Sequence, residues 1–189
     1  MGESNANPFA IYDIAVKIKE CVLPWLETTS EGLPERACVI SGELAWEDCE
    51  CGQLTVAIQN EYEASATNTP RAATETPGRR ACGPPLYTAN FMVTMLRCAP
   101  TGSDAAPPTC AELEAFAKSS TEDAWAVRAG VICCLDAAIS QKLPNGTRLY
   151  HDFVVGTQTR IGPRGACGGS QLPVSVTIMN GCYPCDQIS

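Results

Sequence analysis

The sequence predicts an α+β fold, in which a mixed or antiparallel sheet packs with an N-terminal helix and a longer central helix. Apolar residues recur at three- and four-residue steps from Phe9 to Leu26 and again from Leu113 to Ala138, which is the pattern of an amphipathic helix. Alternating or continuous apolar runs lie between these two segments and after the second, and they predict strands. The order helix, strands, helix, strands is typical of an α+β domain.

Length and composition favour one domain, residues 1–189. A chain of 189 residues with 45% hydrophobic content can bury a large core. Its net charge of -8 would repel phosphate groups over most of the surface, which argues against a nucleic-acid reader with a basic stripe. No apolar run approaches the roughly 20 residues needed to cross a bilayer, and residues 1–8 lack the features of a secretory signal. We therefore expect a protein that is made in the cytoplasm and has no membrane partner.

The first part of the chain divides into the N-terminal helix and two strands. Asn7-Pro8 suits the start of the helix, and Pro24 is expected to end or kink it because proline lacks a backbone donor. After a turn at residues 32–34, residues 36–42 predict a short strand. Residues 53–62 predict a half-buried strand, because apolar side chains alternate with polar or small ones. The apolar set is Leu54, Val56 and Ile58, and the alternate set is Thr55, Ala57 and Gln59.

The segment 64–86 differs in composition from the rest of the chain. It is rich in Thr, Ala, Pro, Gly and Arg and shows no period. Loops of this length inside a compact domain are uncommon and are usually functional or disordered. We interpret it as a long interface loop with Arg79, Arg80 and Pro84 as candidate interface residues, and a solvated surface excursion is the alternative.

The second part contains a central strand, the longer helix and two more strands. Residues 88–98 are dense in apolar side chains and predict the central strand. Thr109-Cys110-Ala111-Glu112 is a capping box that opens the central helix, which Ser119-Ser120-Thr121-Glu122 could break into two pieces. The last two strands are expected around residues 150–158 and 173–180, separated by the glycine-rich residues 162–169.

Twelve cysteines leave three interpretations open. In a reduced protein they pack as small apolar residues, which suits the apolar surroundings of Cys38, Cys133 and Cys134 best. Four of the cysteines, Cys49, Cys51, Cys182 and Cys185, could instead supply a tetrahedral zinc site, although neither pair has a histidine beside it. Disulfides are the third interpretation, with pairings that cannot be read from sequence. The candidate disulfide cysteines are Cys49, Cys51, Cys82, Cys167, Cys182 and Cys185.

No motif predicts an enzyme or a bound cofactor. His151 is the only histidine, and beside Asp152 in a strand it is more typical of a strand or edge residue than of a catalytic base. The chain has no Gly-x-Ser-x-Gly elbow, no phosphate-binding loop followed by Lys and no His-Glu-x-x-His helix. We therefore expect no catalytic residue, no metal and no cofactor.

Several segments together resemble a known family. They are the opening amphipathic helix, residues Leu33-Pro34-Glu35-Arg36, the turn from Trp46 through Asp48-Cys49-Glu50-Cys51-Gly52 to Leu54, the strand end Leu96-Arg97-Cys98-Ala99-Pro100, and the helix after Pro107-Pro108. In these segments the chain is similar to the tail terminator, or a closely related head-tail connector, of long-tailed actinobacterial bacteriophages. The similarity covers most of the chain and rests on structural segments rather than on a catalytic signature.

The resemblance implies a structural virion protein of the phage neck. Such a subunit forms a ring, usually a homohexamer, that caps the head-proximal end of the tail tube and stops its growth. Its partners are other copies of itself, the tail tube protein and the head completion (stopper) protein, while genomic DNA passes through the lumen without specific binding. Another connector of the neck (a stopper or adaptor) and a disulfide-rich secreted binding module remain as alternatives, as does a zinc or thiol enzyme.

Overall fold

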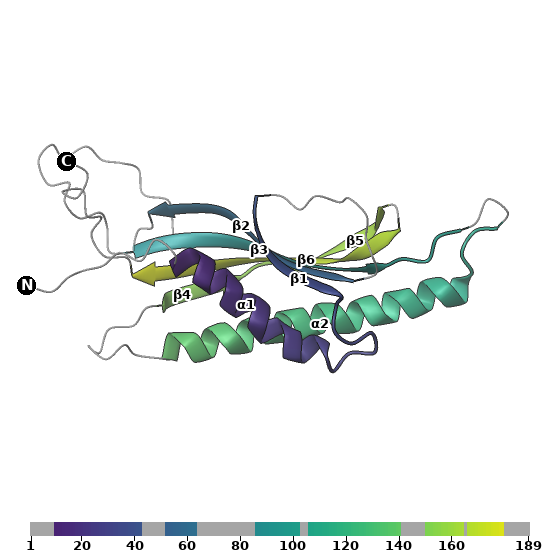
Figure 1. Ribbon diagram of the computed structural model, residues 1–189, viewed down its shortest axis with the longest axis horizontal. Coiled ribbons are helices and arrows are strands. Elements are labelled where there is room, and N and C mark those ends of the chain that lie inside the picture. The colour runs from purple at the N-terminus through teal and green to yellow at the C-terminus, as the bar shows by residue number, and fades with distance from the viewer. Residues whose placement is uncertain are drawn as a thin grey trace, which may run out of the picture.

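The computed structural model describes residues 10–42, 52–63, 86–102, 106–140, 150–164 and 166–179. Within these residues the chain forms two helices and six strands (Figure 1). Their order is α1 (Ala10–Leu26), β1 (Arg36–Ser41), β2 (Gln53–Glu63), β3 (Leu86–Cys98), α2 (Cys110–Ser140), β4 (Tyr150–Val155), β5 (Thr159–Arg164) and β6 (Cys167–Met179). The predicted α+β class, with a shorter N-terminal helix and a longer central helix, is confirmed.

The described strands form one mixed sheet in the order β1-β2-β3-β6-β4, and β5 pairs with β6 beside β4. β1 runs parallel to β2, whereas the other pairings are antiparallel. β3 and β6, with 13 residues each, pair along their whole length from Leu86 opposite Met179 to Cys98 opposite Cys167. The predicted central strand is therefore confirmed as β3.

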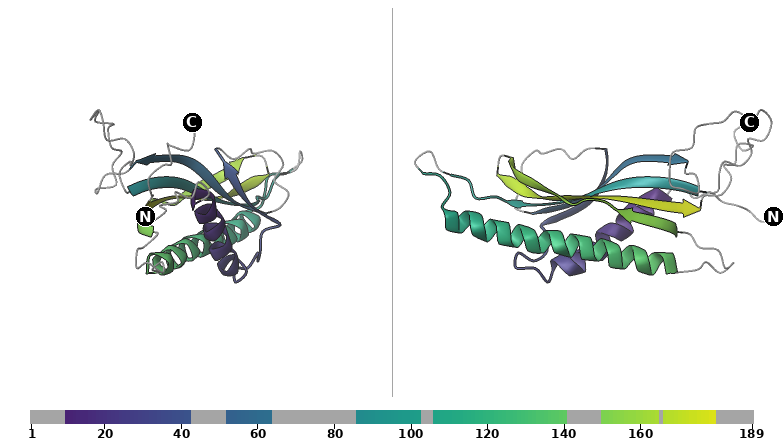
Figure 2. Two further views of the ribbon diagram at one scale, coloured as in Figure 1. Left: turned by 60° about the vertical axis from the view of Figure 1, so that its left-hand side comes forward. Right: turned by 180° about the vertical axis from the view of Figure 1, so that it is seen from behind.

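Both helices cover the same face of the sheet (Figure 2). α1 contacts β1 and β2, while α2 contacts β3, β4 and β6. The apolar stripes of the helices and one face of the strands form the core, and removing this area from water is the main stabilising contribution. Its largest fully buried side chains are Ile14, Ile18, Val22, Leu26, Leu54, Val56, Phe91, Val93, Met95, Val127, Leu135 and Leu172.

The two helices cross in close contact at Gly130 of α2. A Cβ atom at this position would lie 2.9 Å from the Cα atom of Val22 and 3.1 Å from Cδ1 of Trp25. Only glycine lets the two backbones approach this closely without displacing α1. The crossing therefore fixes where α1 lies on α2.

The central helix is confirmed and is continuous over 31 residues, so the alternative of a break at residues 119–122 is wrong. The hydroxyl of Ser119 donates to the carbonyl of Phe116, and that of Thr121 donates to the carbonyl of Ala117. These hydroxyls bond within the helix instead of competing with it. The capping box is confirmed, because Glu112 accepts hydrogen bonds from the backbone and hydroxyl of Thr109, whose hydroxyl accepts one from the Glu112 backbone.

The expectation for the C-terminal strands is wrong in one respect. Most of the glycine-rich segment lies inside β5 and β6 rather than between two strands. A Cβ atom at Gly168 would lie 2.7 Å from Cζ of Phe116, and one at Gly169 would collide with the carbonyl of Met95. Here the glycines allow close packing of strand against helix and strand against strand.

Two smaller expectations also need correction. α1 ends at Leu26, so Pro24 lies in its last turn and does not end it directly; the expected start at Asn7-Pro8 lies outside the described residues. β2 is not half-buried along its length, because Thr55 and Ala57 are as inaccessible as their apolar neighbours. The sheet face opposite the helices is therefore covered in this region.

Candidate assembly site

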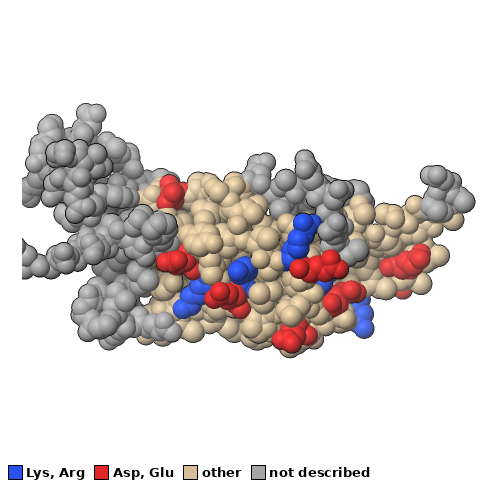
Figure 3. Space-filling view, in the orientation of Figure 1, with Lys and Arg blue, Asp and Glu red and all other residues tan. Residues whose placement is uncertain are grey.

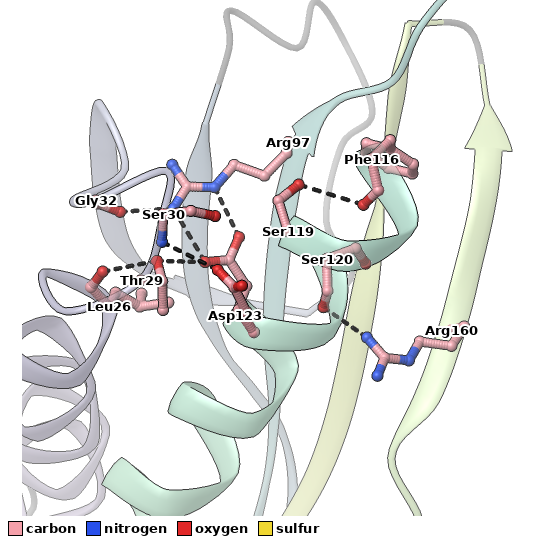
Figure 4. A network of polar contacts seen from close by, with 11 residues as sticks. Leu26, Thr29, Ser30, Gly32, Arg97, Phe116, Ser119, Ser120, Asp123 and Arg160 are labelled. Atoms are coloured by element: carbon pink, nitrogen blue, oxygen red, sulfur yellow. Dashed lines mark hydrogen bonds and ion pairs between the residues drawn. The ribbon is translucent and has the colours of Figure 1, made fainter. Parts of the chain in front are cut away.

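A buried ion pair joins the centre of the sheet to the long helix. Arg97 at the end of β3 donates from Nε to Oδ2 of Asp123 in α2 at 2.8 Å and from Nη2 to Oδ1 at 3.2 Å (Figure 4). The side chains are only 8% and 3% exposed. A two-pronged contact of this kind satisfies both oxygens of the carboxylate and fixes the orientation of the guanidinium.

The turn after α1 contributes further hydrogen bonds to this ion pair. Nη2 of Arg97 also donates to the carbonyl of Gly32 at 2.6 Å, and the hydroxyl of Thr29 donates to Asp123 at 2.9 Å. Beside them, the backbone N–H of Ser30 donates to Glu122 at 3.1 Å. Hydrogen bonds from the side chain and backbone of Ser30 lower the pKa of Glu122, so this carboxylate is held in its charged form. We call Thr29, Gly32, Arg97 and Asp123 the buried polar node.

Three of the segments quoted for the family resemblance meet at this node. A Cβ atom at Gly52 would lie 3.3 Å from Nη1 of Arg97 and 3.4 Å from both the Glu35 backbone nitrogen and the Pro34 Cα. Gly52 adopts a φ of 130°, a backbone conformation that residues other than glycine rarely adopt. Segments far apart in the sequence are thus brought together around one arginine, and they define a packing centre.

The opposite side of α2 forms hydrogen bonds with β5 and with the connection between β4 and β5. Arg160 of β5 donates to the carbonyl of Ser120 at 2.6 Å, as Figure 4 shows. The amide of Gln158 donates to the carbonyl of Ala124, and Arg128 donates to the carbonyl of Gly156. The long helix is therefore held by polar contacts on both flanks as well as by the core.

An exposed aromatic group lies on the outer side of the helix layer. Trp125 is 62% exposed, and its ring packs edge-to-face on Trp25 of α1 with 5.6 Å between ring centroids. Ile132, seven residues further along α2, lies on the same helix face and is 37% exposed. We call Trp25, Trp125 and Ile132 the tryptophan patch. Exposed aromatic clusters of this kind are enriched where proteins contact one another.

Charge on the helix side is mixed. In Figure 3 acidic and basic side chains alternate over this face, and acidic ones also lie at the end where α2 begins. A band of a single sign, which would steer a polyanion or a polycation, does not form on the face in view. This surface suits a protein partner better than a phosphate backbone.

The cysteines depart from the expectation in three places. Cys21 and Cys134 form a disulfide between the two helices, with their Cα atoms 5.8 Å apart, so the expectation that Cys134 stays reduced is wrong. Cys38 and Cys133 are exposed rather than packed in the core. Cys38 lies on an edge strand, on the face opposite the helices, and Cys133 lies one residue away from the buried side of α2.

Most of the candidate site residues lie outside the described residues. These are Cys49, Cys51, Cys82, Cys182, Cys185, Arg79, Arg80 and Pro84. Cys167 is described, and it is 5% exposed and disulfide-bonded. Arg79, Arg80 and Pro84 therefore remain candidate interface residues on the basis of the sequence alone.

The residues that the structure describes form neither a metal site nor a membrane-spanning helix. No group of three His, Cys, Asp or Glu residues among them could hold a metal ion, and the four cysteines of the zinc interpretation lie outside them. His151 is exposed on β4. Neither described helix is long and apolar enough to span a membrane.

Sequence reasoning missed the polar node and the tryptophan patch. The signal for the node was present, because Arg97 ends an apolar strand and Asp123 interrupts the apolar stripe of the long helix. Charges at core positions are almost always paired. Trp125 lies just off the same stripe, where a large apolar side chain has to be exposed.

Comparison with known proteins finds solved structures that are similar to this chain. No protein-family model matches the chain, and no curated protein matches it. One similar solved structure is the sheath/tube terminator of an extracellular contractile injection system (PVC) in its extended state. The two chains are 12% identical with a TM-score of 0.38, and the match covers 95% of this chain and 58% of the other. This chain thus spans little more than half the length of that neighbour.

Proposed function

We propose that this chain is a tail terminator, a structural protein of the neck of a long-tailed phage. In this proposal the whole chain, residues 1–189, is one tail-terminator-like domain, and segment 64–86 is its interface loop. Copies of the chain form a ring, a homohexamer, on the head-proximal end of the tail tube. The ring stops tube growth, joins the tube to the head completion protein and lets genomic DNA pass.

The observation that carries the proposal is the convergence at the buried polar node. The segments Leu33-Pro34-Glu35-Arg36 and Leu96-Arg97-Cys98-Ala99-Pro100, Gly52 and the long helix were selected by sequence resemblance alone, yet they pack on one another around Arg97 and Asp123. Segments that jointly build a packing centre are determinants of a fold. Their convergence supports the interpretation that the whole fold of the family, and not an isolated motif, is shared.

A ring needs two different surfaces that fit each other. In a closed ring each subunit presents one face to one neighbour and another face to the next. The tryptophan patch supplies an apolar face on the helix layer. Edge strand β1, where Arg36, Cys38 and Ser41 are exposed, supplies a second face with backbone groups able to pair with another chain.

The charge of the chain suits a lumen that DNA crosses. Phosphate contacts dominate the affinity of proteins for nucleic acids, so a basic lumen would retain the genome. With a net charge of -8, the subunit is expected to repel DNA and let it pass.

We expect electron microscopy and light scattering of the purified protein to show rings, and Trp125→Ala to weaken them. A central interface tryptophan typically contributes about 2 kcal/mol or more, which is about a 30-fold change in affinity. The matched control is Val154→Ala, because Val154 is 53% exposed on the opposite face of the sheet. Monomers at all concentrations would contradict the ring, and equal assembly of both variants would exclude the patch.

Shortening the interface loop should separate folding from assembly. Replacing residues 66–80 by a short Gly-Ser link removes a segment that is too costly to order unless a neighbour holds it. We expect an unchanged circular dichroism spectrum and a raised concentration for half-assembly. A shortened protein that assembles like the parent would make the loop dispensable.

The secreted binding module is kept as a second candidate because of one observation. The bonded cysteines Cys21, Cys134 and Cys167 are typical of proteins that work in an oxidising environment. A virion also meets such an environment after release from the cell. Electron microscopy separates the two, since a binding module would remain a single subunit.

A further inference from the structure

In the part of the chain that the structure describes, the sheet ends in two strands that each have one neighbour. β1 lies at one edge beside β2, and β4 lies at the other edge beside β6. An edge strand presents backbone N–H and C=O groups that can pair with a strand of another chain. Both edges are therefore places where a second copy can add a strand.

Three residues of β1 direct their backbone groups away from β2. The N–H of Arg36 donates to the carbonyl of Gly52 at 3.2 Å, so Arg36 faces β2. The N–H of Gly42 likewise donates to the carbonyl of Ile58 at 2.9 Å, and the register between these points has no shift. Because successive residues of a strand direct their backbone groups to alternate sides, the odd-numbered residues face outward. They are Ala37, Val39 and Ser41.

β4 has the same arrangement at the other edge. The N–H of Gly156 donates to the carbonyl of Pro173 at 2.9 Å. The register from Asp152 to Val155 has no shift, so the even-numbered residues of this part face β6. Phe153 and Val155 therefore direct their backbone groups outward. The N–H of Phe153 agrees with this direction, because it donates to the carboxylate of Asp152 at 2.8 Å.

The outward-facing residues also carry apolar side chains that are only half-buried. Ala37 and Val39 pack against the core from the β1 edge. Phe153 and Val155 pack against it from the β4 edge. A strand added at either edge covers the apolar surface that these side chains leave in water, which is favourable.

β5 pairs with β6 beside β4 but is a poorer edge. Pro163 lacks a backbone donor, and Gly162 has no side chain to pack. Arg160 carries the same charge as Arg36 of β1. Proline and charge are typical of edge strands that avoid pairing. β4 is therefore the better partner for β1.

We propose that β1 of one copy pairs antiparallel with β4 of the next copy, so that the sheet continues from subunit to subunit. This inference rests on the proposed ring, in which each copy meets its neighbours through two different surfaces. β2, β3, β6 and β4 are successively antiparallel and β1 is parallel to β2, so β1 and β4 run in opposite directions. Copies placed side by side therefore present these two strands antiparallel. The tryptophan patch adds side-chain contacts only, because a helix bonds its own backbone groups.

One register matches the two edges best. With Val39 opposite Phe153, Ala37 lies opposite Val155. Each of these pairs joins two outward-facing residues, so their backbone groups can exchange hydrogen bonds. The four half-buried side chains then cover one another and extend the core across the junction.

The same register places Cys38 opposite Val154 on the sheet face away from the helices. Cys38 is exposed, and Val154 is 53% exposed. Both residues direct their backbone groups to their own sheet, so they form a non-hydrogen-bonded pair, with Cα atoms about 4.5 Å apart. Val154→Ala keeps the backbone hydrogen bonds of the junction and shortens one exposed side chain, so it remains a mild change beside Trp125→Ala.

This register also displaces successive copies along the strands. Within one copy Ser41 lies level with Val155, whereas across the junction Val155 lies opposite Ala37. The residues that connect Ser41 to Val155 across the sheet are Ile58, Phe91 and Val174. The difference of four residues is about 13 Å at about 3.3 Å per residue. A sheet closes into a barrel only when its strands are staggered, so the displacement suits a closed ring.

A cysteine at position 154 tests the pairing in the whole protein. In Val154→Cys the new thiol would lie opposite Cys38 of the next copy, within the Cα separation of about 7 Å that a disulfide needs. Oxidised glutathione accepts the two electrons and leaves as two thiols. We expect most chains to be joined in non-reducing gels, with the Cys38 peptide bonded to the peptide that carries residue 154. Cys38→Ala in the same background should abolish this product.

Asp152→Cys is the matched control on the same strand and face. Its thiol would lie opposite Ile40 and diagonal to Cys38, at a Cα distance of about 7–8 Å, and should give little of the joined product. Equal joining of Val154→Cys and Asp152→Cys to Cys38 would overturn the proposed register.

Co-assembly distinguishes a ring contact from a two-fold contact. A mixture of wild type and Val154→Cys/Cys38→Ala has one reactive partner on each chain, so it should give joined pairs and nothing longer. A product that joins Cys38 to Cys38 in the oxidised wild type would show that β1 pairs with β1, and it would overturn the proposal.

Hydrogen exchange of the wild type gives a check without a substitution. Assembly should slow exchange in residues 37–41 and 153–155, because outward N–H groups become bonded to the next copy. Rings in which these residues exchange as fast as in the dissociated protein would overturn the pairing and leave the ring standing. Joined chains without rings would support the pairing and count against the ring. A protein that stays monomeric at all concentrations would overturn both.

Discussion

Replacing Arg97 by Met is expected to lower the free energy of unfolding by about 3–5 kcal/mol, since removing one partner of a buried ion pair leaves the other charged and unsatisfied. Asp123 is 3% exposed and would lose both hydrogen bonds from the guanidinium, while Gly32 would lose a donor. For a chain of this size each kcal/mol corresponds to roughly 2–4 °C in Tm. Urea and thermal unfolding measure the change directly.

A second substitution distinguishes the lost pair from lost packing. In Arg97→Met/Asp123→Leu neither charge is left alone, so the double variant should be clearly more stable than the sum of the two single variants. Arg160→Met is the control, because this exposed arginine makes one hydrogen bond to α2 and should cost less than about 1 kcal/mol. Additive costs of Arg97→Met and Asp123→Leu in the double variant would contradict the coupling.

Local patterns predicted the elements of the fold and some of their boundaries. The stripe through Ile14, Ile18 and Val22, the apolar run of β3 and the capping box at Thr109 each act over a few residues, so the sequence alone reveals them. Gly168 and Gly169 led to the wrong prediction of a connection between two strands, because glycine is typical both of turns and of places where backbones approach closely. Which of these applies depends on Phe116 and Met95, which are distant in sequence.

The pairings between elements could not be predicted in the same way. Cys21 and Cys134 are 113 residues apart, and they meet only because the helices cross beside Gly130. Arg97 and Asp123 likewise depend on the placement of α2 over β3. Sequence periodicity shows which face of a helix is buried but not which residue of another element lies opposite it. The site is assembled from such pairings, and it was therefore predicted less completely than the fold.

Removing the helix-to-helix disulfide should have an effect as large as that of breaking the ion pair. A crosslink that closes a loop of about 100 residues restricts the unfolded chain by about 4–5 kcal/mol in the chain-entropy treatment. Cys21→Ala/Cys134→Ala is therefore expected to be about that much less stable than the oxidised wild type. Cys133→Ala is the control, because this adjacent cysteine is exposed and carries no crosslink. Guanidinium unfolding without reductant gives the comparison.

Repeating the measurement with reductant completes a thermodynamic cycle. Reduction opens the Cys21–Cys134 bond in the wild type, whereas the double variant has no such bond to lose. The bond at Cys167 opens in both proteins, so its contribution cancels in the difference between them. Under reducing conditions the difference in the free energy of unfolding between the two proteins should therefore shrink to the small cost of replacing two cysteines by alanine. Because the buried core and the polar node need no crosslink, the reduced wild type should stay folded, as the proposed function requires. A reduced wild type that unfolds in buffer would show that the helix layer depends on the disulfide, and it would count against the proposed function.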